Sequence, residues 1–344
     1  MRKAKALALI LCLLAAGCAA GLVKSPAERG KAAYAEGRYK DAAKDLRAAA
    51  VKGDPEAAFL LAGLYAKGLG VPQDDAETVR LARLAAQHGH AEAQYLLGFA
   101  YREGRGVAAD KTESARWFIA SARQGYDRAI FEAGRIYLAG EGVPKDPDLG
   151  VRWLTRGAQD GHAGARYMLA VLKNEGRYIP EDPEGARALA LAAARQGLAA
   201  AQTLYAGLCA EGRGGPVDYP EALQWYMRAA ENGNAEACLA LGLLYEDGRG
   251  VTPDMAKAAA WYEAAARMGD APSRYRMGLL YAFGRGVPQD DASAWAWLSL
   301  ALSGPAPLPE KTASLARDLM KTLENRMNAT QLSEARRKAA EAAK

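Results

Sequence analysis

Three series of residues recur every 36 positions along most of this 344-residue chain. The aspartate series is Asp74, Asp110, Asp146, Asp182, Asp218, Asp254 and Asp290. Six residues before each aspartate lies a glycine: Gly68, Gly104, Gly140, Gly176, Gly212, Gly248 and Gly284. The third series is Ala57, Ala93, Ala129, Ala165, Ala201 and Ala237, with Ser273 in the seventh place. A fixed period between about 20 and 50 residues marks a chain that stacks one supersecondary unit. We therefore expect one quasi-linear domain, in which each unit contacts its neighbours.

The amino-acid composition favours helices throughout this array. Apolar residues make up 50% of the chain and charged residues 25%, which argues against disorder over most of its length. Alanine is abundant and β-branched residues are few, a balance typical of closely packed helices rather than strands.

The first residues have the pattern of a bacterial export signal. Arg2, Lys3 and Lys5 precede an apolar run over residues 6–16. That run is too short to cross a bilayer of about 30 Å as a helix, so we expect residues 1–17 to be a signal peptide.

The signal ends in a sequence that resembles a lipobox, the lipoprotein cleavage site. In such signals the cysteine, here Cys18, becomes the acylated first residue, and residues 18–26 would be a linker from the lipid. Ala15 holds the place where leucine is usual, and Leu14 lies one position earlier. The alternative is cleavage at the small residues that follow, which would give a free periplasmic protein. Ala19, by analogy with these lipoproteins, indicates the outer membrane.

Removal of the signal changes the charge and the cysteine count. It deletes three basic residues, so the net charge falls from +5 to +2, which gives no support for nucleic-acid binding. Cys209 and Cys238 then remain beside Cys18. On paired helices they would be offset by about 10 Å along the axis, too far for a disulfide, so we expect two buried free thiols.

Residues 93–128 show how one unit is built. Apolar residues at helical spacing fill residues 93–103, and Gly104 ends this first helix because glycine adopts positive φ without penalty. After a short connection, Asp110 is placed to cap a second helix, with Glu113 completing a capping box. The same pairing recurs at two other starts: Asp74 with Glu77, and Asp218 with Glu221. Gly125 ends the second helix.

A tryptophan shares one place in most second helices: Trp117, Trp153, Trp225, Trp261 and Trp297. These rings could form a ladder for stacking a ligand. Their helical neighbours are alanine and leucine, so we interpret them as core between repeats. Small residues such as Gly98 share one place in the first helices, where they allow neighbouring helices to approach closely.

The unit resembles the Sel-one-like repeat, a relative of the tetratricopeptide repeat. Residues 237–269 follow that pattern through Leu241-Gly242, the loop 248–251, Asp254, and Trp261-Tyr262. The resemblance covers residues 57–304, seven units, and implies an all-α, right-handed superhelical solenoid of antiparallel helix pairs. Residues 27–56 are similar to a tetratricopeptide helix pair, which would cap the array. Residues 305–344 would cap the other end, with helices at about 310–326 and 331–343.

No catalytic, cofactor or metal site emerges from the sequence. The aspartates lack the dense oxygen ligands of a calcium loop, and capping explains them better. His88, His90 and His162 flank turn glycines, where we expect solvent-facing residues rather than metal ligands. Some Sel-one-like relatives associated with β-lactams carry a cysteine pair in every repeat. This chain lacks those pairs, so that activity is not carried over.

One set of residues is a candidate binding edge. Five arginines share a place in the first loop: Arg105, Arg177, Arg213, Arg249 and Arg285. Stacked units would align them, and the row would attract an anionic glycan or an acidic protein face. The alternative is that this place tolerates any solvated residue. The unit 165–200 departs most from the pattern, with Lys173, Tyr178 and Leu189 in place of tyrosine, glycine and tryptophan, which indicates either a site or drift.

The sequence thus favours a non-catalytic scaffold, lipid-anchored in the cell envelope and facing the periplasm. The resemblance implies protein partners, in assembly of an envelope or exopolysaccharide secretion complex or in restraint of a sensor protein. Direct binding of an anionic glycan is an alternative. An envelope enzyme acting on cell-wall glycans or β-lactams is a further one, for which no titratable cluster is found.

Overall fold

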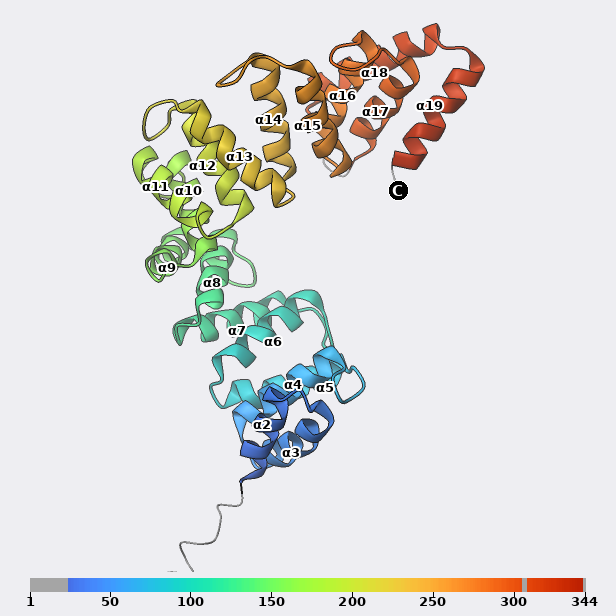
Figure 1. Ribbon diagram of the computed structural model, residues 1–344. Coiled ribbons are helices and arrows are strands. Elements are labelled where there is room, and N and C mark those ends of the chain that lie inside the picture. The colour runs from blue at the N-terminus through green and yellow to red at the C-terminus, as the bar shows by residue number, and fades with distance from the viewer. Residues whose placement is uncertain (1–23, 305–307, 343–344) are drawn as a thin grey trace, which may run out of the picture. The chain divides into compact units, whose positions relative to one another are not determined.

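The computed structural model describes residues 24–304 and 308–342, and all regular structure there is helical (Figure 1). The predicted signal peptide, Cys18 and most of the predicted linker lie outside the described residues. The expected all-α fold of stacked helix pairs is confirmed.

Each repeat contributes a first and a second helix of nearly constant length. The first helices are α4 (Pro55–Lys67), α6 (Ala91–Glu103), α8 (Asp127–Ala139), α10 (Ala163–Glu175), α12 (Ala199–Glu211), α14 (Ala235–Asp247) and α16 (Ala271–Phe283). The second helices are α5 (Asp75–Gln87), α7 (Lys111–Arg123), α9 (Pro147–Gln159), α11 (Pro183–Ala194), α13 (Tyr219–Glu231), α15 (Met255–Arg267) and α17 (Asp291–Ser303). The pair α2 (Pro26–Ala35) and α3 (Tyr39–Val51) precedes them, and α18 (Glu310–Arg326) and α19 (Ala329–Ala342) follow.

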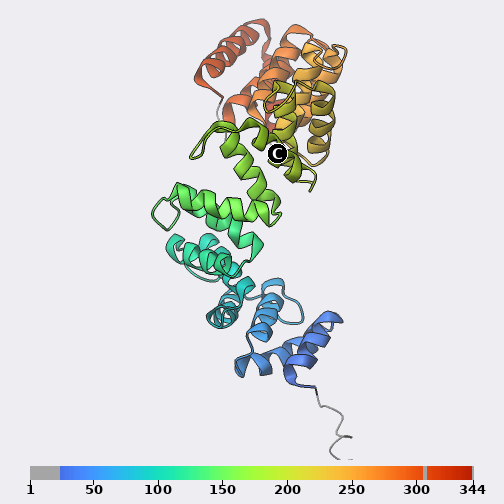
Figure 2. The same cartoon turned by 90° about the vertical axis from the view of Figure 1, so that its left-hand side faces the viewer.

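The chain divides into two compact units, and the division falls within α9, between Trp153 and Leu154. In the first unit, each helix from α2 to α8 packs against the next in chain order. In the second unit the same order runs from α10 to α17, and both α18 and α19 pack against α17. Figure 2 shows this succession of helix pairs inside each unit from a second direction. The 36-residue period continues across the division without change.

The predicted helix ends are confirmed. Gly104 lies at φ 69° after α6, and its backbone N–H donates to the carbonyl of Ala100. Gly125, after α7, lies at φ 86°. Asp110 accepts hydrogen bonds from the backbone N–H groups of Thr112 and Glu113 at 2.8 and 3.1 Å, which caps α7 as expected. All seven aspartates of the periodic series cap a second helix in this way.

The predicted capping boxes at these helices are wrong. The backbone N–H of Asp110 already donates to the carbonyl of Tyr101, at 2.9 Å, so it is not available to Glu113. Glu113 instead pairs with Arg116, one turn further along the helix, at 3.1 Å. The same displacement occurs at the other two predicted boxes, where Glu77 binds Arg80 and Glu221 accepts from Trp225. The backbone N–H of Asp110 is therefore paired with a carbonyl at the end of the first helix, and the Glu113 side chain with the next turn of its own helix.

The interpretation of the tryptophans as core is supported by their packing. Trp117 is 9% exposed and Trp225 6% exposed. Trp117 joins an apolar cluster that contains Leu81 of the preceding repeat and Leu97 of its own. Gly98 is a point of close approach, because a Cβ there would lie 2.7 Å from the ring of Phe118.

A second glycine in six of the seven first loops brings the loop close to the backbone of the preceding helix pair. Gly106 lies at φ 68°, and a Cβ on it would collide with the backbone carbonyl of Asp75 in the preceding repeat. Tyr178 replaces this glycine in the fourth repeat and keeps the same conformation, at φ 67°. It is the one residue other than glycine with positive φ in residues 24–304 and 308–342.

Candidate binding surface on the first helices

Cavities recur at equivalent places of the array, between one first helix and the next. In the first unit they lie between α4 and α6, at about 250 Å³, and between α6 and α8, at about 320 Å³. In the second unit they lie between α12 and α14, at about 190 Å³, and between α14 and α16, at about 100 Å³. Each is floored by the second helix of the earlier repeat. We call these four cavities the first-helix cavities.

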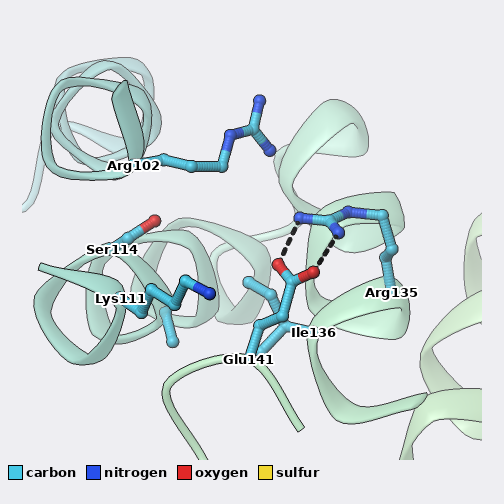
Figure 3. Close-up of a pocket in the computed structure, with 7 residues that line it drawn as sticks. Arg102, Lys111, Ser114, Arg135, Ile136 and Glu141 are labelled. Atoms are coloured by element: carbon cyan, nitrogen blue, oxygen red, sulfur yellow. Dashed lines mark hydrogen bonds and ion pairs between the residues drawn. The ribbon is translucent and has the colours of Figure 1, made fainter. Parts of the chain in front are cut away.

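The cavity between α6 and α8 is lined by charged side chains (Figure 3). Arg102 comes from α6, Lys111 from the start of α7, and Arg135 from α8. Glu141, in the loop after α8, receives two hydrogen bonds from Arg135, both 2.8 Å. These bonds lower the pKa of Glu141 below its ordinary value, against the opposing effect of its partial burial.

A buried carboxylate joins the two arginines of this cavity. Glu132 is 7% exposed, and its Oε2 lies 3.0 Å from Arg102 and 3.1 Å from Arg135. The Arg102 guanidinium also lies over the ring of Phe99, 4.1 Å from the centroid. Arg102 also pairs with Glu103, at 3.1 Å. Of the three cations that line the cavity, Lys111 is the one that no ion pair engages among the described residues, and it supplies an unpaired positive charge.

The cavity between α14 and α16 contains a similar pair with the charges exchanged. Glu246 holds the place of Arg102, and Arg276 holds the place of Glu132, each four repeats of 36 residues further along the chain. Their side chains lie 2.9 Å apart, and the hydroxyl of Tyr262 donates to the same oxygen of Glu246 at 2.6 Å. Burial first, and this hydrogen bond second, raise the pKa of Tyr262.

The cavity between α12 and α14 lacks both members of that pair. The two equivalent places hold Ala210 and Ala240. Tyr226, equivalent to Tyr262, is 8% exposed, and among the described residues its hydroxyl has no hydrogen-bond partner. Glu211 and Glu236 also line this cavity and make no ion pair in the described part of the chain.

The cavity between α4 and α6 is mainly apolar. Leu96, Leu97 and Phe99 line it together with Val79, and Asp75 and Arg105 lie at its edge. The four cavities therefore share a position in the repeat but differ in chemistry: apolar, positive, negative and ion-paired. Such a surface suits contacts with several different side chains of another molecule.

The predicted row of arginines is largely engaged with carboxylates of this chain. Arg105 lies 3.0 Å from Asp75 in the preceding repeat, and Arg213 lies 2.6 Å from Glu181. Arg177 and Arg249 pair with nearby acids in their own repeats: Glu175 at 3.3 Å and Asp247 at 3.1 Å. Arg285 lines the cavity between α14 and α16. The row's positive charge is thus substantially balanced where it lies.

The histidines prove to be structural in part. His90 and His162 are half-buried and cap α6 and α10, each accepting from a backbone N–H, so the expectation that both face solvent is wrong. His90 also stacks on Phe59, with centroids 4.5 Å apart. His88 is exposed. Within residues 24–304 and 308–342, no group of three or more potential ligands is placed to hold a metal ion.

The expected free thiols are confirmed at Cys209 and Cys238, both buried. Burial raises the pKa of each thiol, which keeps it protonated and unreactive. Cys209 occupies the place of a tyrosine in other repeats and accepts from Arg187 at 3.2 Å. These thiols are part of the core.

Sequence reasoning missed the residues that give the cavities their character. Lys111, Glu132 and Tyr226 are not singled out by the period, because the period marks what is constant. A comparison of equivalent places would have shown Glu132, because the places of Arg102 and Glu132 carry charge in two of the cavities and alanine in a third.

The family model of the Sel1 repeat matches seven successive segments of this chain: residues 55–90, 91–126, 127–162, 163–198, 199–234, 235–270 and 271–304. The chain belongs to the Sel1-repeat family. Together the seven segments cover the whole array of first and second helices.

One solved structure supports this Sel1-repeat assignment over most of the chain. A Sel1 repeat protein from Oxalobacter formigenes is 29% identical, with a TM-score of 0.69, over 92% of this chain and 91% of that one. The structure of c5321, a protective antigen present in uropathogenic Escherichia coli strains and displaying an SLR fold, is 25% identical. It aligns with a TM-score of 0.46 over 88% of this chain and 79% of that one. A search of curated proteins found no match.

Among the helices described for this Sel1-repeat protein, none has the length and apolar character needed to cross a bilayer.

Proposed function

We propose that this Sel1-repeat protein is a non-catalytic, protein-binding scaffold of the bacterial cell envelope. The Sel1-repeat fold itself implies protein–protein interaction. The observation that carries the proposal is the series of first-helix cavities, which lie at equivalent places but differ in charge and polarity. Stacked repeats offer extended surfaces of this kind to other macromolecules.

The envelope location in this proposal rests on the N-terminal sequence. A basic segment, a short apolar run and Cys18 together resemble a lipoprotein signal. In the proposal the lipid on Cys18 holds the scaffold at the periplasmic side of the outer membrane, where it takes part in assembly of an envelope or exopolysaccharide secretion complex. Restraint of a periplasmic sensor protein is the alternative role for the same surface.

Photo-crosslinking in cells tests the binding surface. A photoreactive amino acid is placed at Phe99, Leu204 or Phe283, which line or border first-helix cavities in both units. Met227, 39% exposed on the second helix α13, is the matched control. We expect the same protein adduct from positions on the first helices and none from Met227. Equal capture from Met227 would contradict the assignment of the surface, and mass spectrometry of the adduct would identify an assembly protein or a sensor.

Labelling with a fatty-acid probe tests the anchor independently. Incorporation is expected in the unmodified chain and should be lost in Cys18→Ala. Incorporation that persists in this variant, or none in either chain, would remove the lipid anchor from the proposal while leaving the protein-binding surface in place.

Two other functions make different predictions. An anionic-glycan binder would be retained on an acidic polysaccharide in a salt-sensitive manner, through Arg105, Arg177, Arg213, Arg249 and Arg285. The ion pairs that four of these arginines make argue against this. An envelope enzyme would turn over nitrocefin or peptidoglycan as a purified protein, and such turnover would overturn the non-catalytic assignment.

A further inference from the structure

Three first-helix cavities share a design in which an arginine can lie beside an aromatic ring and a carboxylate. Between α6 and α8, Arg102 lies 5.5 Å from the centroid of Phe118 and 3.0 Å from Glu132. Between α14 and α16, Arg276 lies 5.5 Å from the centroid of Tyr262 and 2.9 Å from Glu246. Phe118 and Tyr262 hold equivalent places in their repeats. In these two cavities, therefore, the chain supplies its own arginine.

The cavity between α12 and α14 has the ring but no arginine of its own. Its ring is Tyr226, equivalent to Phe118 and Tyr262. Alanine stands at both places from which an arginine reaches the ring elsewhere, Ala210 and Ala240. The cavity measures about 190 Å³.

Two residues that line this cavity have an oxygen that can accept a hydrogen bond and receives none in the described part of the chain. Tyr226 is 8% exposed, and its hydroxyl has no partner among the described residues. The buried Oδ1 of Asn174, which also lines the cavity, has none either. A buried polar atom left unpaired costs about 1–3 kcal/mol, so the Asn174 oxygen favours a ligand that donates hydrogen bonds. The Tyr226 hydroxyl, which lines the cavity, is available to accept another.

The charge of the cavity specifies the ligand further. Glu211 and Glu236 lie at its exposed edge, without an ion pair within the described part of the chain. Burial, and then these two carboxylates, raise the pKa of Tyr226, which keeps its hydroxyl neutral. The cavity therefore presents negative charge and several acceptors, and a guanidinium group matches them with five N–H donors in a planar fork.

We propose that the cavity lined by Asn174, Glu211, Tyr226 and Glu236 is a receptor for an arginine side chain of a protein partner. The guanidinium would lie beside the ring of Tyr226, as Arg276 lies beside Tyr262, and would pair with the two glutamates. The inference rests on the proposed function, because another protein must present the arginine. The partner's binding segment must therefore carry an arginine whose side chain is exposed before binding.

A blocked arginine, Nα-acetyl-arginine methylamide, is the probe that tests this receptor directly. Binding is followed by the ring resonances of Tyr226 in the full chain labelled with ¹³C-tyrosine, assigned by their loss in Tyr226→Phe. We expect a saturable shift below about 100 mM probe, and binding at least about tenfold weaker for the neutral citrulline analogue. The absence of a saturable shift, or equal binding of citrulline, would overturn the proposal.

Variants separate the specific site from general charge attraction. The double variant Glu211→Gln with Glu236→Gln should weaken binding at least about tenfold. Its control, Glu184→Gln with Glu231→Gln, removes two exposed carboxylates of the same unit that do not line the cavity and should bind as the unmodified chain does. Equal loss in both double variants would reduce the effect to net charge and overturn the site.

Filling the cavity is a second, independent test. Ala210→Glu with Ala240→Arg rebuilds the pair found between α14 and α16, and the rebuilt arginine should exclude the probe. Binding that survives in this variant, with its helical circular dichroism unchanged, would contradict the proposed location. A lysine probe that binds as tightly as arginine would overturn the assignment to guanidinium.

Free L-arginine distinguishes a protein ligand from a free amino acid. Its α-ammonium and α-carboxylate cancel, so its net charge equals that of the blocked probe and it should bind no more tightly. Tighter binding of free L-arginine would indicate an amino-acid receptor and overturn the partner assignment. Because these tests need no partner, their failure would leave photo-crosslinking of the first-helix surface intact, and the two proposals can fail separately.

Discussion

The hydroxyl of Tyr262 donates a hydrogen bond to Glu246 across 2.6 Å, whereas the hydroxyl of Tyr226, one repeat earlier, donates none within the described residues. The two tyrosines occupy the same place in the repeat and are buried to a similar degree. They therefore form a natural pair for measuring what the hydrogen bond contributes.

We expect Tyr262→Phe to lower the free energy of unfolding by about 1.5–3 kcal/mol, because a hydrogen bond to a charged group is lost. Tyr226→Phe should change it by less than about 0.5 kcal/mol, since the hydroxyl has no partner to lose. Urea unfolding of the two variants measures the difference. Equal costs would contradict the interaction geometry described for Tyr262.

Ser273 is the one interruption of the alanine series, and replacing it should stabilise the protein. It is fully buried, and its Oγ finds no hydrogen-bond partner within the part of the chain described. Ser273→Ala should raise stability by about 1 kcal/mol. Ser114 is the control, because its Oγ donates to the carbonyl of Gly98 at 2.8 Å and Ser114→Ala should destabilise by about 1 kcal/mol. Thermal unfolding gives both signs.

Glycine-to-alanine changes on first helices should depend on the neighbouring helix. At Gly98 the new Cβ would lie 2.7 Å from the Phe118 ring, and we expect a loss of about 1–3 kcal/mol from overpacking. At Gly63 nothing lies within 4 Å of the new Cβ, so Gly63→Ala should add about 0.5–1 kcal/mol through helix propensity. Urea midpoints compare the two variants, and a gain at Gly98 would refute the close approach.

Tyr178 has a left-handed backbone conformation, which is unfavourable for residues that have a side chain. Its φ is 67°, in the left-handed region, and its side chain is 40% exposed. Tyr178→Gly should therefore stabilise the chain by about 1 kcal/mol, through relief of this strain. Tyr178→Ala, which keeps a Cβ, is the control and should not give that gain. Urea unfolding distinguishes them, and a destabilised glycine variant would show that the tyrosine ring makes a more valuable contact.

The docking of α19 on α17 should weaken in acid. Lys338 in α19 binds Asp290, the cap of α17, at 2.8 Å. Burial alone would raise the pKa of Asp290, but hydrogen bonds from Lys338 and Ser293 lower it from 3.8 to about 2. Because the folded pKa lies below the unfolded one, the stabilisation is complete above about pH 4 and is lost as the pH falls toward 2.

Hydrogen exchange of the α19 amides at several pH values measures this coupling. Lys338→Met should expose α19 to faster exchange at pH 6, and the difference from the unmodified chain should shrink between about pH 4 and pH 2. A difference that stays constant over this range would show that packing by the lysine stem, rather than its charge, holds α19.

The sequence predicts what each repeat does locally, and much less of what repeats do to each other. The caps at the periodic aspartates and the turn at Gly104 follow from backbone chemistry within a few residues, and both are confirmed. The capping box at Glu113 failed because Tyr101, nine residues before Asp110, supplies the carbonyl that its N–H needs. Such a contact depends on how the loop folds back.

The chemistry of the cavities was harder to predict from the sequence, because it also depends on contacts between residues far apart in the chain. The pair formed by Arg102 and Glu132 joins residues 30 positions apart, on first helices of successive repeats. Which side chains meet there depends on the tilt and spacing of stacked helices, which the period does not specify. The row of arginines could be predicted as a set, but their carboxylate partners, such as Asp75, could not.

The main-chain joints of the repeat have an evolutionary consequence. The N–H of Asp110 binds the carbonyl of Tyr101, and Gly106 rests on the backbone of the preceding repeat at Asp75. Because backbone atoms make these contacts, a duplicated segment of 36 codons would encode the residues that form the same contacts. The number of repeats can then change by recombination, while the residues at the cavities mutate separately and give each copy a different specificity.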